Sequence, residues 1–195
     1  LIGRQETKEL IDHLKEDYPI LVEEVTPEPL SIGDVQKVLA KLLKENVSIR
    51  NLPVIFETLA DYGKMTTDTD LLAEYVRQSL SAQLTKQYVS DNESLNVITI
   101  SQQVEEVIMN HIQQTEHGNY LALDPETQQT IVNNIHEQVE QASLQYENVI
   151  LLCSPAIRMY VKQLIERTLP NIAVLSYNEL EPNVQIQSIG VVDVA

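Results

Sequence analysis

The sequence predicts an α+β protein, in which a helical bundle subdomain is followed by a small α/β subdomain with a four-stranded mixed sheet. Residues 1–89 repeat their apolar side chains with the period of a helix and contain no convincing strand. The later residues alternate helical patterns with short apolar runs that are typical of buried strands. The polar stretch 90–96 separates these patterns. We therefore expect an all-helical subdomain at 1–89, a linker at 90–96 and an α/β subdomain at 97–195.

The clearest part of the helical subdomain is a pair of amphipathic helices at residues 31–63. Ser31 with Asp34 three residues later is typical of a helix N-cap. The apolar residues that follow at helical spacing are Val35, Val38, Leu39, Leu42 and Leu43. The second helix places Phe56 on its apolar side, which predicts that Phe56 lies in the core. Gly63 stands where a left-handed residue commonly closes a helix.

Two further helices are expected on either side of this pair. The first runs from about residue 4 to residue 16. The other is a single long helix from about residue 68 to residue 88, because apolar residues recur at every fourth position. These residues are Leu72, Val76, Leu80 and Leu84.

The α/β subdomain is predicted to follow the order β-α-α-β-α-β-β. Its strands are expected at 97–100, 149–152, 173–175 and 184–192. Its helices are expected to begin at Ser101, Asp124 and Ser154, and Gly118 is expected to lie beyond the end of the first one. A change of apolar phase near Gly190 predicts a bulge in the last strand. Helices between strands imply parallel pairing with right-handed crossovers for part of the sheet.

The chain carries 29 acidic and 13 basic residues, which gives a formal charge of −16. Nucleic acids and anionic lipids bind proteins through Lys and Arg, so neither is expected as a partner. Lys37, Lys41 and Lys44 cluster on one helix, but neighbouring acids favour a solvated helix face. No apolar run reaches 18 residues and no signal peptide is recognisable. Because the sequence begins with Leu1, we expect a fragment or processed product, and a membrane portion upstream would leave no trace here.

No catalytic, cofactor-binding or metal-binding set of residues is predicted. Five scattered glycines form neither a phosphate-binding loop nor a dinucleotide fingerprint, so no cofactor is expected. His111 and His117 would need a third ligand from elsewhere to hold a metal. The single cysteine, Cys153, ends an apolar strand, which favours a buried structural thiol over a nucleophile. We therefore predict a protein that is not an enzyme.

Arg50 has two interpretations. It follows the first helix of the pair at 31–63, where a long cation can bind the last carbonyl groups of that helix. It can instead contact a neighbouring subunit, because protein interfaces are enriched in Arg. The sequence leaves both interpretations open.

Three long segments resemble a known family in the right order along the chain. They are GRQETKELIDHL, LSIGDVQKVLAKLLKENVSIRNLPVIFETLADYG and LLCSPAIRMYVKQLIERTLPNIAVLSYNEL. Together they resemble the C-terminal cytoplasmic region of the FlhA-type export-gate proteins of the flagellar and injectisome type III secretion apparatus. The resemblance extends over essentially the whole chain.

The resemblance implies a protein on the cytoplasmic face of the bacterial inner membrane, with a multi-pass membrane region upstream of this soluble fragment. In such a protein the cytoplasmic domains form a nine-membered ring, and this fragment alone would be a monomer. Implied partners are export substrates and their chaperones, the export ATPase complex and other export-gate proteins. The family's chaperone-binding cleft lies mainly upstream, so no residue of it is assigned. Arg4 and Arg50 are our candidates for subunit contacts in the ring.

Two other functions remain open from the sequence alone. One is a nucleotide-dependent α/β enzyme, which the lack of a glycine-rich loop disfavours. The other is a soluble adaptor with no membrane connection. The sequence does not distinguish a flagellar from an injectisome apparatus, nor does it identify the cargo.

Overall fold

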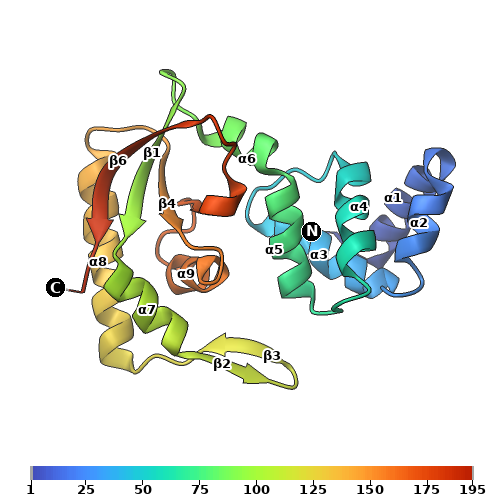
Figure 1. Cartoon of the computed structure of the whole chain (residues 1–195), viewed down its shortest axis with the longest axis horizontal. Helices are drawn as coiled ribbons and strands as arrows, with labels where there is room; N and C mark the ends of the chain where they lie inside the picture. Colours follow the sequence, from blue (N-terminus) through green and yellow to red (C-terminus); the bar gives the residue numbers. More distant parts are fainter. Residues whose placement is uncertain (1, 195) are drawn as a thin grey trace. The chain divides into compact units, whose positions relative to one another are not determined.

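The computed structural model describes residues 2–194, and the chain forms two compact units, residues 1–81 and 82–195 (Figure 1). The first is helical and the second combines helices with a sheet, so the predicted α+β class is confirmed. The boundary differs from the prediction of 1–89, 90–96 and 97–195, since residues 94–96 of the expected linker already belong to a strand. None of the helices within 2–194 is long and apolar enough to cross a membrane.

The earlier boundary reflects a break in the long helix that the apolar spacing predicted. The structure has two helices there, α5 (Thr69–Ser79) and α6 (Ser81–Tyr88). Leu80 between them leaves helical geometry, and its N–H group bonds the carbonyl oxygens of both Val76 and Arg77. A spacing of four continues across such a break because the residues on both sides still face a core, so the pattern alone cannot reveal it.

The first unit packs five helices around one core. They are α1 (Arg4–Asp17), α2 (Pro19–Val25), α3 (Ile32–Lys44), α4 (Leu52–Tyr62) and α5. Helix α3 packs against α1 and α5, and α4 packs against α2 and α5. Phe56 is completely buried, as predicted. The predicted cap is also present, because the Ser31 hydroxyl accepts from the Asp34 N–H (3.0 Å) while the Asp34 carboxylate accepts from the Ser31 N–H (3.0 Å).

Two details of the helical pair need correction. Val35, Val38, Leu39 and Leu42 are buried, but Leu43 is 39% exposed, because at about 100° per residue it lies at the edge of the stripe. Gly63 is right-handed (φ −62°, ψ −24°), so it does not close α4 in the left-handed form. Glycine fits there because a Cβ would stand 2.6 Å from the Leu59 carbonyl oxygen and 3.2 Å from Pro29 Cγ.

The second unit is built on a four-stranded sheet in the order β5-β4-β1-β6. Its strands are β1 (Ser94–Ile100), β4 (Val149–Cys153), β5 (Val174–Ser176) and β6 (Gln185–Val192). All three pairings are parallel, so the prediction of a mixed sheet is wrong. The predicted bulge is present, because Val97 pairs with Ser188 and Ile98 pairs with Gly190.

The parallel direction of β6 follows from the path of the chain after β5. The connection contains a short 3₁₀ helix, η1 (Tyr177–Glu179), and returns over one face of the sheet. Leu180 and Val184 pack there on a cluster that includes Leu95 and Leu175. This connection brings the chain back to the amino end of the sheet before β6 begins, so β6 runs parallel to β1. The sequence shows only two apolar strand patterns in succession and does not indicate the path between them.

Helices cover the opposite face of the sheet. They are α7 (Gln102–Asn110), α8 (Pro125–Ser143) and α9 (Arg158–Ile165), whose apolar side chains share one core with alternate residues of the strands (Figure 1). Asp124 caps α8 as predicted, since its carboxylate accepts from the Thr127 N–H (3.1 Å). Ser154 does not cap α9, which begins only at Arg158, and its N–H donates to the Glu105 carboxylate instead (2.9 Å).

A β-hairpin replaces the end of the predicted helix after Ser101. Helix α7 ends at Asn110, and β2 (Ile112–Thr115) pairs antiparallel with β3 (Gly118–Leu121). Gly118 has φ +119°, a region that favours glycine and suits the turn. The hairpin projects from the lower end of α7 as drawn in Figure 1. Its residues are only partly buried or exposed, so it offered little of the apolar alternation that identifies a strand.

A buried ion pair joins α9 to the end of β5 and to η1. Arg158 is 0% exposed and Glu179 is 1% exposed, with Arg158 Nε 3.7 Å from Glu179 Oε2. Arg158 Nη1 donates to the Val174 carbonyl oxygen (2.9 Å), and Glu179 Oε1 accepts from the Ser176 N–H (3.1 Å). The pair therefore fixes the point at which the chain leaves β5.

Replacement of Phe56 by Ala should lower the free energy of unfolding by about 3–5 kcal/mol, because it leaves a cavity among fully buried neighbours. Urea unfolding followed by circular dichroism measures this loss. Met65→Ala is the matched control, since Met65 is 74% exposed and its truncation should change little. Equal effects from both variants would contradict the assignment of Phe56 to the core.

Replacement of Glu179 by Leu should cost about 3–5 kcal/mol of stability, because it leaves the Arg158 guanidinium buried without its carboxylate. The double variant Arg158→Met/Glu179→Leu should recover much of that loss, because it removes both charges. The same urea unfolding measures both variants. A double variant that is less stable than the single one would show that the two charges do not depend on each other.

Candidate functional site

The carboxyl ends of the parallel strands are where α/β proteins commonly hold their ligands. Cys153 ends β4 there and is completely buried, as the predicted structural thiol should be. Burial, and then electrostatic interaction with Glu105 and Cys153, raises the pKa of Tyr177. A raised pKa keeps the phenol protonated at neutral pH, so Tyr177 is not an activated base. This end of the sheet therefore offers packing and hydrogen bonds rather than a nucleophile with its base.

The histidines do not form a metal centre with neighbouring acids. His111 follows α7, where its Nδ1 lies 2.6 Å from the Val107 carbonyl oxygen, and His117 lies in the turn between β2 and β3. Within the described part of the chain, no three His, Cys, Asp or Glu side chains are placed to share a metal ion.

The first unit carries a groove between α1 and α3, which we call the α1–α3 groove. It has a volume of about 870 Å³ and a mainly apolar lining. The lining residues are Ile2, Glu6, Lys37, Ala40, Lys41, Leu43 and Lys44. Three lysine ammonium groups and one carboxylate, that of Glu6, stand around it.

The sequence of α3 builds this groove directly. Lys37, Lys41 and Lys44 recur at helical spacing on one side, and Leu43 stands beside them at the edge of the apolar stripe. Lys41 also pairs with the Asp70 carboxylate on α5. The lysines are apparent in the sequence, where the acids beside them indicated a solvated face. The groove is not apparent there, because Glu6 lies on α1 and Ile2 just before it, and no local pattern joins these residues to α3.

Arg4 and Arg50, the predicted interface residues, lie on separate elements of the first unit. Arg4 is exposed at the start of α1, and its Nη2 lies 3.0 Å from the point where a Cβ on Gly33 would stand. A guanidinium can lie this close to α3 because residue 33 has no side chain. Arg4 is thereby held against the same two helices that form the α1–α3 groove.

Arg50 is exposed in the connection between α3 and α4. Between residues 2 and 194 its guanidinium has no hydrogen bond or ion pair, while its N–H donates to the Ser48 hydroxyl (3.3 Å). The last carbonyl groups of α3 accept from backbone amides instead, with Val47 N–H donating to the Leu42 oxygen (2.9 Å). The helix-cap interpretation of Arg50 therefore has no contact to support it, and the interface interpretation stays a prediction.

Comparison with known proteins places the chain in a family and agrees with the fold. The profile of the FHIPEP family matches residues 1–185. The chain belongs to the FHIPEP family. One family relative, the flagellar biosynthesis protein FlhA of Bacillus subtilis, is 66% identical over 194 residues, which cover 100% of this chain and 29% of that protein. Another, the low calcium response locus protein D of Yersinia pestis, is 33% identical over 97% of this chain and 27% of its own length.

Solved structures of similar proteins share the fold. The Chlamydia pneumoniae CdsV protein superposes with a TM-score of 0.91 at 32% identity, covering 98% of this chain and 55% of that one. The nonameric SctV-C of EPEC superposes with a TM-score of 0.87 at 34% identity, covering 98% and 57%. This FHIPEP chain thus spans under a third of the curated relatives and little more than half of the solved chains. The resemblance to FlhA-type export-gate proteins is confirmed, and the family includes proteins of flagellar biosynthesis and of type III secretion.

Proposed function

We propose that the chain is part of the cytoplasmic portion of a membrane-embedded protein-export gate at the bacterial inner membrane. In this function it is a non-enzymatic platform on which export substrates, substrate–chaperone complexes and the export ATPase complex dock. The observation that carries the proposal is the 66% identity to a flagellar biosynthesis protein over the whole chain. The buried Cys153 and the protonated Tyr177 support a role in binding rather than in catalysis.

We infer that nine copies assemble into a ring in the full-length protein, in contact with the other export-gate proteins. The nonameric assembly of the similar EPEC protein supports this inference. A charge of −16 makes copies repel one another, so the chain alone should be a monomer. Attachment of nine copies to one membrane assembly raises their local concentration, and weak contacts then suffice.

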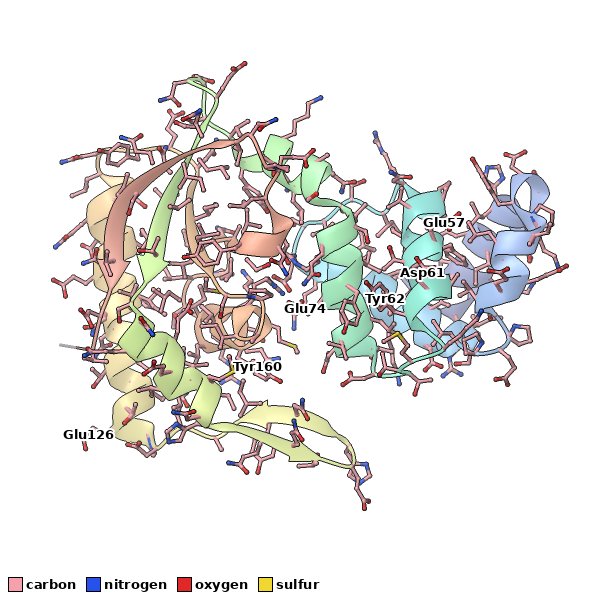
Figure 2. All side chains as sticks on the ribbon, viewed as in Figure 1. Glu57, Asp61, Tyr62, Glu74, Glu126 and Tyr160 are labelled. Carbon is pink, nitrogen blue, oxygen red and sulfur yellow. The ribbon has the colours of Figure 1, made fainter. Side chains whose placement is uncertain are left out.

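Charge complementarity suggests where such contacts form on the first unit. Arg4 and Arg50 are exposed cations, and Glu57 and Asp61 are exposed acids on one side of α4 (Figure 2). A closed ring requires two different surfaces of each copy to meet head to tail. We propose that the cations of one copy face acids of the next.

The chain should replace the corresponding segment of FlhA in Bacillus subtilis, because two thirds of the residues are identical throughout. A chimeric protein carrying this segment should restore swimming motility and secretion of flagellar proteins to a strain that lacks its own FlhA. The same strain with FlhA truncated before this segment is the control. A chimera that accumulates normally but supports neither motility nor secretion would contradict the proposed function.

Arg50→Glu in that chimera should impair motility, because it places a like charge against the acids of the neighbouring copy. The free energy of unfolding of the isolated variant should stay within about 0.5 kcal/mol of the parent's, since the Arg50 guanidinium has no hydrogen bond or ion pair with residues 2–194. Lys64→Glu is the matched charge reversal, because Lys64 is also exposed in the first unit. Normal motility with a clear loss of stability would assign Arg50 to folding instead.

A further inference from the structure

A second hollow lies at the amino ends of the parallel strands and is lined by several hydrogen-bond acceptors. The proposed export-gate function assigns no role to it. We call it the amino-end pocket. Its volume is about 400 Å³. The lining residues are Ser90, Asp91, Asn92, Asn96, Gln145, Tyr146, Glu147 and Gln187. Two are carboxylates, four are amides and none is basic.

The pocket lies where a long helix ends. Helix α8 has 19 residues and ends at Ser143, and Gln145, Tyr146 and Glu147, which line the pocket, come just after its C-cap residue Leu144. A helix C-terminus carries partial negative charge, and a Lys or Arg in the last turn commonly balances it. The last turn of α8 contains no basic residue. The helix end therefore adds to the negative potential of Asp91 and Glu147.

Asn96 is independent evidence that the pocket can accept a hydrogen-bond donor from a ligand. Asn96 is 5% exposed on β1, and its Nδ2 donates to the Glu147 carbonyl oxygen (2.9 Å), which fixes the direction of the amide. Its Oδ1 accepts no hydrogen bond from the described residues. The neighbouring Asn92 differs, because its Oδ1 accepts from Ser94 Oγ (2.8 Å) within its own loop. A buried acceptor without a donor is uncommon in folded proteins and points to a ligand.

We propose that the amino-end pocket binds an arginine side chain from a basic segment of a partner protein. A guanidinium carries five donors in one plane and stays charged, so it can meet the two carboxylates together and direct a further donor toward the Asn96 amide oxygen. Tyr146, which lines the pocket, packs partly buried against the core beneath it and so helps to hold Glu147 in place. A lysine has only a point charge for the same acceptors. This inference does not depend on the export-gate function, because it rests on the second unit alone.

Titration of the 195-residue chain with N-acetyl-arginine amide tests the proposal by amide NMR. Saturable shifts are expected at residues 90–96 and 145–147, at millimolar ligand as suits one side chain. N-acetyl-citrulline amide has the same shape without charge and should bind at least about fivefold more weakly, because charge-assisted hydrogen bonds are the stronger ones. Equal shifts with citrulline, or shifts that avoid these residues, would overturn the proposal.

Two variants distinguish binding in the pocket from non-specific attraction of a cation to an acidic chain. Asp91→Asn/Glu147→Gln should weaken arginine binding at least about fivefold, while the rest of the spectrum stays unchanged and reports an intact fold. Glu126→Gln is the matched control, because Glu126 is exposed at the opposite end of α8 (Figure 2) and should leave binding unchanged. Equal affinity of the double variant and the control would reject the pocket. Saturation of the same amides by calcium chloride at lower concentration than by the arginine amide would assign it to a metal ion instead.

Discussion

The ion pair between Arg158 and Glu179 is the constraint on which the second unit depends. Arg158 is the largest of the fully buried side chains, and a buried guanidinium is tolerated only where acceptors surround it. Val174 on β5 and Glu179 on η1 supply them, so α9, β5 and η1 are fixed in one arrangement. That arrangement determines where the chain leaves β5 and returns over the sheet. The return makes β6 parallel and brings Gln187 to the amino-end pocket.

The sequence predicted those features that depend on neighbours along the chain. The Ser31 cap, the burial of Phe56 and the start of α8 after Asp124 all follow from residues within one or two helical turns. The features that it missed depend on distant partners. The direction of β6 is set by packing of Leu180 and Val184 on the far face of the sheet, and a local pattern carries no information about that path. The break at Leu80 was hidden because apolar spacing continues on both sides of it.

For the candidate sites too, the sequence predicted what depends on single residues and missed what depends on residues distant in the chain. Arg4 and Arg50 were found as exposed cations because exposure and residue type can be inferred from the pattern. The three lysines of α3 were found too, but not the groove, since Ile2 approaches α3 from outside that helix. The amino-end pocket was beyond reach because its acids Asp91 and Glu147 are far apart in sequence. Only the parallel pairing of β1 with β4 brings the loops before them together.

The α1–α3 groove and the amino-end pocket differ in local charge, although the chain as a whole carries a formal charge of −16. The α1–α3 groove gathers three lysines around an apolar floor, while the amino-end pocket contains carboxylates and a helix C-terminus without a cation. The carboxylates of the amino-end pocket are the basis of the proposed arginine site, whereas one lysine of the α1–α3 groove is already paired with Asp70. Salt should weaken the attraction of a basic ligand to the pocket, because the pocket is open to solvent and its charges are screened. Such a ligand would respond to the charges within a screening length of about 8 Å more than to the total of −16.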